Sequence, residues 1–137
     1  MNALSFILII AALAVVAADS PWDSIFVAAY IDPNHPDCAR AIMPYDSTTS
    51  SIDFPTDFYT SGADNINGEG YSCHNVMPPT LDSWGPLPTS VNGTSIIVDF
   101  SSKGGPSNLT GQWKEYSSEK MGILWEDGNF WEEIQHH

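Results

Sequence analysis

Carboxylates and histidines are the side chains of this sequence that could do acid–base chemistry, and they form no recognisable catalytic set. Glu132 and Glu133 are adjacent in an expected strand, so their side chains point to opposite faces and cannot act together on one bond. Asp99 follows the apolar pair Ile97-Val98, and we expect an exposed strand residue there rather than a buried functional acid. The sequence also lacks nucleophile-elbow, phosphate-loop and zinc-helix motifs. We therefore predict no catalytic residues and no enzyme.

Histidines near cysteines are the second candidate for chemistry. His35 lies three residues before Cys38, and His74 directly follows Cys73. If the two cysteines are bonded, the histidines could approach each other and form a metal or catalytic cluster with an acid. The interpretation we favour is that both are ordinary loop residues, so we predict no metal ligands.

A weak calcium site is the third candidate. Asn65-Ile-Asn-Gly68 matches positions three, five and six of a calcium-binding EF-hand loop. Positions one and twelve would be Ala63 and His74, which supply no carboxylate. Asp64 and Glu69 could still hold calcium weakly, but we predict no required cofactor.

Tryptophans near short polar side chains give the leading prediction of a binding site. An indole can stack on a sugar ring while Asp and Asn bind its hydroxyls. The residues predicted to bind are Trp84, Trp131, Asp127 and Asn129. The alternative is that these rings fill the core, as a small β-domain requires large apolar side chains. We expect that role for Trp113 and Trp125.

The strongest structural signal is the stretch Ile123–Ile134, in which Asp127-Gly128 separates two runs rich in β-branched and aromatic residues. Asp-Gly tolerates positive φ at both centres of a two-residue turn, which predicts a β-hairpin. That turn would pair Trp125 with Phe130 and Leu124 with Trp131. Trp125 and Trp131 would then lie on opposite faces, one as core and the other available for a ligand.

Short strands separated by turn signals extend through the rest of the chain. We expect strands at Ile25–Ile31, Ala39–Met43, Ser95–Phe100 and Leu109–Tyr116, with Asn92-Gly93 as a turn. Met77–Pro88 holds four of the ten prolines, which favours coil or an edge strand. The pattern predicts an all-β fold, an antiparallel meander forming a small barrel or sandwich.

The first 18 of the 137 residues carry no charge and end in the small residues Ala17-Ala18. This pattern is typical of a secretory signal peptide cleaved before Asp19, leaving one β-rich domain over residues 19–137. A membrane anchor is the alternative, but the apolar run is short for one. In a secreted chain, the two cysteines Cys38 and Cys73 predict a single disulfide.

The charge balance excludes two classes of partner. The chain has 4 basic and 17 acidic residues, a net charge of −13. Such a chain cannot neutralise phosphates, so we expect no nucleic acid and, after signal cleavage, no membrane as a partner. Asn92 and Asn108 each begin a glycosylation sequon and lie in expected loops, so we predict a secreted glycoprotein.

Several motifs in one order resemble a group of small secreted all-β proteins of uncharacterised function. They are His35-Pro-Asp-Cys38, Gly62-Ala-Asp64, Ile97–Pro106, Gly111-Gln-Trp113 and Gly122–Trp131, spread over about 100 residues. The resemblance implies a single β-rich domain with a C-terminal hairpin, and it implies no catalytic residue.

These observations predict a non-enzymatic extracellular binding domain that recognises carbohydrate or another extracellular surface through aromatic residues. The alternative is a structural subunit that pairs strands with copies of itself into a filament or layer. Glycans, other extracellular proteins and further copies of this chain are the corresponding partners.

Overall fold

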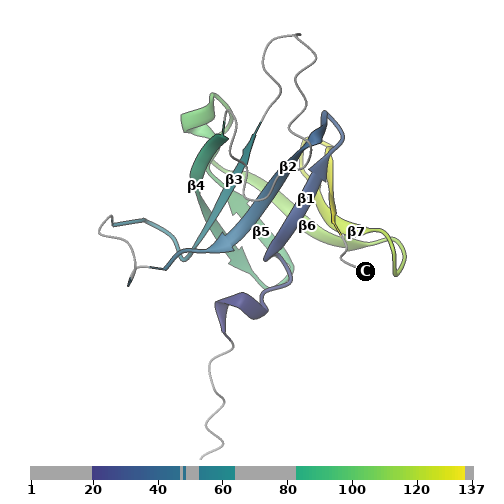
Figure 1. The fold of residues 1–137 in the computed structure, drawn as a ribbon, viewed down its shortest axis with the longest axis horizontal. Helices are drawn as coiled ribbons and strands as arrows, with labels where there is room; N and C mark the ends of the chain where they lie inside the picture. Colours follow the sequence, from purple (N-terminus) through teal and green to yellow (C-terminus); the bar gives the residue numbers. More distant parts are fainter. Residues whose placement is uncertain (1–19, 47, 49–52, 64–82, 135–137) are drawn as a thin grey trace, which may run out of the picture.

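The computed structural model describes residues 20–46, 48, 53–63 and 83–134 of the chain as a barrel (Figure 1). Eight antiparallel strands follow one another in chain order, and β1 closes the barrel by pairing with β8. The strands are β1 (Ala28–Asp32), β2 (His35–Pro44), β3 (Phe58–Ala63), β4 (Ser83–Asn92), β5 (Ser95–Val98), β6 (Leu109–Glu115), β7 (Met121–Trp125) and β8 (Phe130–Glu133). The predicted all-β antiparallel meander is confirmed, and of the two expected forms it takes the barrel.

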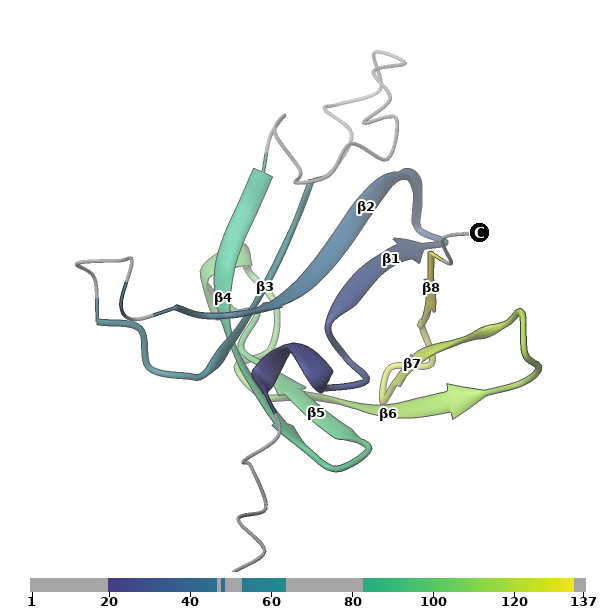
Figure 2. The same ribbon diagram turned by 60° about the horizontal axis from the view of Figure 1, so that its bottom comes forward.

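Closure leaves each of the eight described strands paired on both sides (Figure 2). Two 3₁₀ turns accompany the strands: η1 (Pro21–Asp23) before β1, and η2 (Ser101–Lys103) between β5 and β6. Figure 1 shows η1 at the lower end of the barrel and η2 at the upper end. Within the described part of the chain, no helix has the length and hydrophobicity needed to cross a membrane.

Side chains that alternate along the strands fill much of the barrel interior, as the two-residue period of a strand requires. A single cluster joins strands from around the barrel: Phe26, Tyr30, Ile42, Leu87, Ile96, Val98, Phe100, Ile123, Trp125 and Trp131. Trp113 packs against it, with its ring 5.8 Å from that of Phe26. The predicted core positions of Trp113 and Trp125 are consistent with this packing.

The C-terminal hairpin exists, but its predicted register is wrong by one residue. Leu124 pairs with Phe130 and Ile123 with Trp131, instead of Leu124 with Trp131. The N–H of Gly128 donates to the carbonyl of Trp125, and the N–H of Trp125 donates to Asn129, so the loop has three residues rather than two. Gly128 has φ of +90°, as expected. A shift of one residue changes which faces meet, so Trp125 and Trp131 lie on the same, interior face.

The proline-rich segment also departs from its prediction of coil or an edge strand. Residues 83–92 form β4, which lies between β3 and β5 in the barrel. Thr60 pairs with Leu87 and Gly62 pairs with Trp84, so the two residues Gly85 and Pro86 oppose one residue of β3. This β-bulge places Pro86 where the ladder is already interrupted.

The same bulge changes the direction of Trp84. Leu87 and Thr89 are buried interior residues of β4, so an uninterrupted strand would direct residue 84 outward. The extra residue resets the alternation, and Trp84 packs against the interior cluster beside Gly62. Bulges commonly re-aim a side chain in this way.

Several predictions lie outside the described residues. They concern the signal peptide over residues 1–18, the calcium loop at residues 64–69, His74, and Cys73 as the disulfide partner of Cys38. Cys38 itself is completely buried on β2. These predictions stand as they were made.

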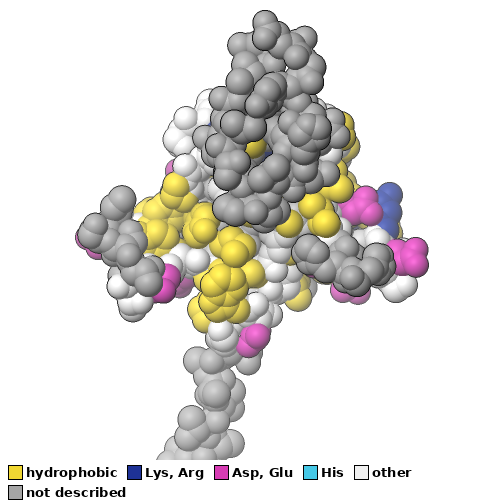
Figure 3. Space-filling model, in the orientation of Figure 1, with side chains coloured by type: hydrophobic (Ala, Val, Ile, Leu, Met, Phe, Trp, Pro, Cys, Tyr) yellow, Lys and Arg dark blue, Asp and Glu magenta, His cyan; other side chains and the backbone are white. Residues whose placement is uncertain are grey.

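The outer surface carries a few large apolar side chains. Among the described residues, the exposed ones are Trp22, Ile25, Ile97 and Tyr116. Hydrophobic side chains gather at the lower middle of the face seen in Figure 3, toward the end that carries η1. The two sequon residues Asn92 and Asn108 are both exposed, the first at the end of β4 and the second just before β6.

Candidate functional site: a cavity at one end of the barrel

One end of the barrel holds a cavity of about 350 Å³. Because the strands run up and down, the β1–β2, β5–β6 and β7–β8 connections lie at the same end, and all three contribute to the cavity. Its lining residues are Asp32, Asn34, His35, Arg40, Trp84, Phe100, Lys103, Gly104, Gly105, Pro106, Leu109, Trp125, Asp127, Asn129 and Trp131. This volume is close to the lower limit of ligand-pocket volumes, which is roughly 300 Å³.

A buried ion pair forms one wall of this cavity. Arg40 on β2 is 1% exposed, and its Nη2 lies 3.2 Å from Oδ2 of Asp32 at the end of β1. Nη1 of Arg40 donates to the carbonyl of Ala63. Oδ1 of Asp32 accepts hydrogen bonds of 3.0 Å from the backbone N–H of Asn34 and from Nδ2 of Asn129. Burial makes such a pair costly unless its polar atoms are bonded, and Asp32 has both oxygens bonded.

Two tryptophan rings enclose the guanidinium of Arg40. Its Cζ lies 5.1 Å from the centroid of Trp84 and 5.8 Å from that of Trp131. Gly62 makes this packing possible, because a Cβ there would lie 2.5 Å from Cζ2 of Trp84 and 2.9 Å from Cδ of Arg40. The absence of a side chain at position 62 therefore leaves the space in which Arg40 stacks on Trp84. Each cation–π contact adds about 0.5–2 kcal/mol.

The aromatic wall continues with rings that pack edge to face. Trp125 and Trp131 lie 4.9 Å apart between centroids, and Phe100 lies 5.9 Å from Trp125 and 6.2 Å from Trp131. Phe100 also meets Trp84 at 6.2 Å. The four rings form a continuous rigid surface, since such contacts are favoured by the ring quadrupoles.

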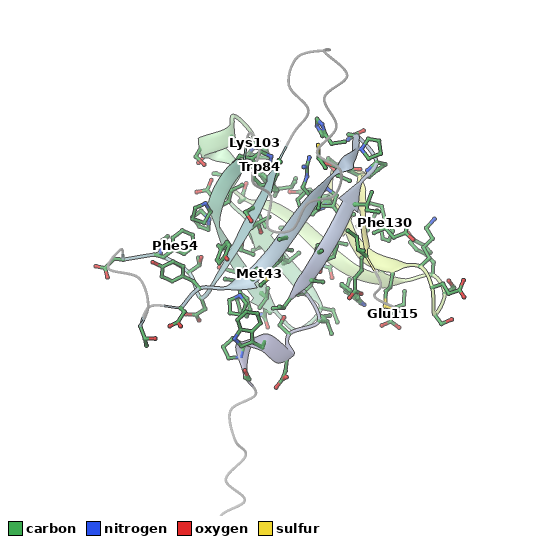
Figure 4. All side chains as sticks on the ribbon, viewed as in Figure 1. Met43, Phe54, Trp84, Lys103, Glu115 and Phe130 are labelled. Carbon is green, nitrogen blue, oxygen red and sulfur yellow. The ribbon has the colours of Figure 1, made fainter. Side chains whose placement is uncertain are left out.

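Polar groups lie around the mouth. Nζ of Lys103, at the end of η2, lies 4.6 Å from the centroid of Trp84, and Figure 4 shows the two side chains together at the upper end of the barrel. Across the mouth, the exposed side chain of Asp127 accepts a 2.9 Å hydrogen bond from the backbone N–H of Asn129. The carboxylate of Asp99 accepts a 2.9 Å bond from the backbone N–H of Ser101. Hydrogen bonds from the side chain and then the backbone of Ser101 lower the pKa of this carboxyl. Asp99 thus shapes the start of η2 and is no buried functional acid.

Two buried indole N–H groups have no hydrogen-bond partner among the described residues, those of Trp84 and Trp125. Both residues line the cavity. Elsewhere in the interior, the hydroxyl of Tyr30 donates a 2.7 Å bond to the carbonyl of Phe26. Burial and the nearby carboxylate of Glu133 raise the pKa of Tyr30 well above its usual range. Tyr30 is therefore a neutral structural donor.

All four residues predicted to bind, Trp84, Trp131, Asp127 and Asn129, line this single cavity. Trp131 is nevertheless 4% exposed inside the barrel, so the expectation of a working outer face on the hairpin is wrong. His35 also lines the cavity.

The sequence analysis did not predict three charged residues that line the cavity: Arg40, Asp32 and Lys103. One signal could have found Arg40: it is a lone charge in the apolar run Ala39–Met43, and a charge in a buried strand needs a partner. The identity of that partner depends on the β1–β2 pairing, which the sequence pattern does not contain.

Comparison with protein-family models, curated proteins and solved structures found no match to this chain.

Proposed function

We propose that this chain is a non-enzymatic binding protein that holds one small ligand in the cavity at the end of its barrel. The observation that carries the proposal is the joint position of a rigid aromatic wall and a bonded polar network on one cavity of about 350 Å³. Ligand sites usually combine apolar walls with a few fixed polar groups. The argument rests on this site, because an eight-stranded barrel by itself serves many functions.

A carbohydrate unit is the ligand class that we propose first. Aromatic side chains would contact the apolar face of the sugar ring, and Asp127 and Asn129 at the mouth would bind hydroxyl groups. The amide of Asn129 is held by Asp32, which fixes the direction of its remaining carbonyl oxygen. Such preorganisation reduces the entropy that binding would otherwise cost.

The setting that we propose is extracellular. A cleaved leader over residues 1–18, a disulfide between Cys38 and Cys73, and glycans on the exposed Asn92 and Asn108 all belong to this proposal. Self-assembly by strand addition has a weaker basis, because each of the eight described strands already has two neighbours.

Calorimetric titration with mono- and disaccharides and small aromatic compounds tests the proposal. We expect saturable binding of one molecule per chain for at least one compound. Leu109→Trp places a large ring on the cavity wall and should abolish that binding. Ile97→Trp, on the exposed side of the neighbouring strand β5, is the matched control and should leave it unchanged. Binding that survives Leu109→Trp, or no binding by any compound, would contradict the proposal.

A further inference from the structure

Asn129 and Trp131 lie two residues apart at the start of β8, and both line the cavity. Residues two apart in an extended chain point to the same side, so the two side chains face the cavity together. Each carries a polar group that no described residue binds. One of these groups is an acceptor and the other is a donor.

The acceptor is the side-chain oxygen of Asn129. Nδ2 of Asn129 donates to Oδ1 of Asp32 at 3.0 Å, and the other oxygen of Asp32 is paired with Arg40. An ionised carboxylate only accepts, so the amide cannot turn round, and Oδ1 of Asn129 faces away from Asp32. This oxygen is not among the unpaired polar atoms that are buried in the described part of the chain, so solvent reaches it.

The donor is the indole N–H of Trp131. Trp131 is only 4% exposed, and none of the described residues accepts from its Nε1. The indole nitrogens of Trp84 and Trp125 are closed off from solvent, whereas that of Trp131 is not. The small accessible part of Trp131 therefore includes its N–H, and a molecule in the cavity can reach it. An almost buried donor without a partner is rare, and a bound ligand would supply the acceptor.

An acceptor and a donor side by side select one kind of ligand. A carboxylate only accepts, and an ammonium only donates, so either would leave one of the two groups unpaired. A hydroxyl group does both. Residues two apart in a strand are about 7 Å apart, so two hydroxyl groups of one sugar ring can each meet one of them. The apolar face of the same ring fits the aromatic wall.

We infer that the ligand is a sugar held at the start of β8 by two of its hydroxyl groups, one donating to Oδ1 of Asn129 and another accepting from Nε1 of Trp131. This inference rests on the proposed function, because it assigns the contacts of the ligand in the same cavity. It gives Trp131 a hydrogen bond to the ligand in addition to its place in the aromatic wall.

Calorimetric titration of D-glucose, D-galactose and D-mannose, each with its monodeoxy analogues, tests the inference. We expect at least one of the three sugars to bind. Two of its monodeoxy analogues should bind about tenfold more weakly, because each leaves a group of the wall unpaired.

Two variants assign these losses. Asn129→Ala should reduce one of the two losses to about twofold or less, and Trp131→Phe, which keeps an aromatic ring, should do the same for the other. Gln112→Ala and Trp113→Phe are the controls, since they remove an amide and an indole N–H outside the cavity, and both losses should persist in them. Asn129 is half-buried in a loop, so Asn129→Ala decides the inference alone if Trp131→Phe does not fold.

Three results would overturn the inference: none of the three sugars binds, no monodeoxy analogue loses affinity, or both losses persist in either folded variant. In the last two cases a sugar still binds, so the proposed function survives. In the first, the wider titration with the Leu109→Trp variant decides the proposed function separately.

Discussion

Arg40 and Asp32 form an ion pair of 3.2 Å across β1 and β2, with side chains that are 1% and 7% exposed. Removing one partner leaves a buried charge alone, which costs about 3–5 kcal/mol, whereas removing both is often far less harmful. Urea unfolding should therefore show that Arg40→Met and Asp32→Asn each destabilise the protein strongly. The double variant should lose clearly less stability than the sum of the two, and simple additivity would argue against a coupled pair.

Trp125 and Trp131 should be equally important for folding. Because both rings are buried inside the barrel and 4.9 Å apart, we expect Trp125→Ala and Trp131→Ala each to lower the free energy of unfolding by about 3–5 kcal/mol. Trp22→Ala is the control, since that ring is 60% exposed, and its effect should stay within about 0.5 kcal/mol. A Trp131→Ala variant as stable as the Trp22→Ala variant would place Trp131 on the surface.

Gly128 should resist replacement for backbone reasons alone. Its φ is +90°, and no heavy atom lies within 4 Å of a Cβ added there, so steric collision plays no part. We expect Gly128→Val to cost about 1–2 kcal/mol in thermal or urea unfolding. Gly128→Asn should cost less, because Asn tolerates positive φ better. Equal effects of the two changes would refute this explanation.

Glu133 should make the protein less stable at neutral than at acidic pH. Partial burial raises the pKa of its carboxyl, so the folded state holds the proton more tightly than the unfolded chain. This contribution favours folding below the unfolded pKa, roughly 4.3, and disappears as the pH rises through the folded pKa. Glu133→Gln should therefore melt higher than the native protein near pH 7 and equally near pH 4. Glu119→Gln, in the exposed β6–β7 turn, should show no such difference.

Cys38 and Cys73 should be bonded to each other. The chain has two cysteines, and the leader that we propose over residues 1–18 would bring it to an oxidising compartment. Thiol titration of the denatured, unreduced protein should find no free thiol, and two thiols should appear after reduction. If two thiols titrate before reduction, the two cysteines are not bonded to each other.

Much of the fold was predictable because local signals are strong in this chain. A β-branched run marks β5, and the Asn92-Gly93 and Asp127-Gly128 pairs mark turns, each with its glycine at positive φ. Loop length at Asp127-Gly128 was not predictable, since Asp-Gly fits both two- and three-residue loops. The one extra residue in the loop determines that the Trp131 side chain faces the barrel interior rather than the outside.

Only part of the candidate site could be predicted from the sequence. Trp84, Trp131, Asp127 and Asn129 were selected for their residue types, and all four line the cavity. The partners that orient them come from elsewhere in the chain: Asp32 bonds Asn129, 97 residues away, and Arg40 stacks on both rings. Those contacts depend on barrel closure and on the bulge in β4, which are properties of strand pairing rather than of any local pattern.

The bulge at Gly85-Pro86 has a consequence for how this protein can vary. Before it, the interior residue of β4 is Trp84, which borders the cavity; after it, the interior residues are Leu87 and Thr89, which fill the packed part of the barrel. The bulge shifts by one residue the alternation of inward-facing side chains between the two parts of β4. Substitutions can therefore reshape the cavity wall while the packed pattern, and the stability that it provides, stays as it is.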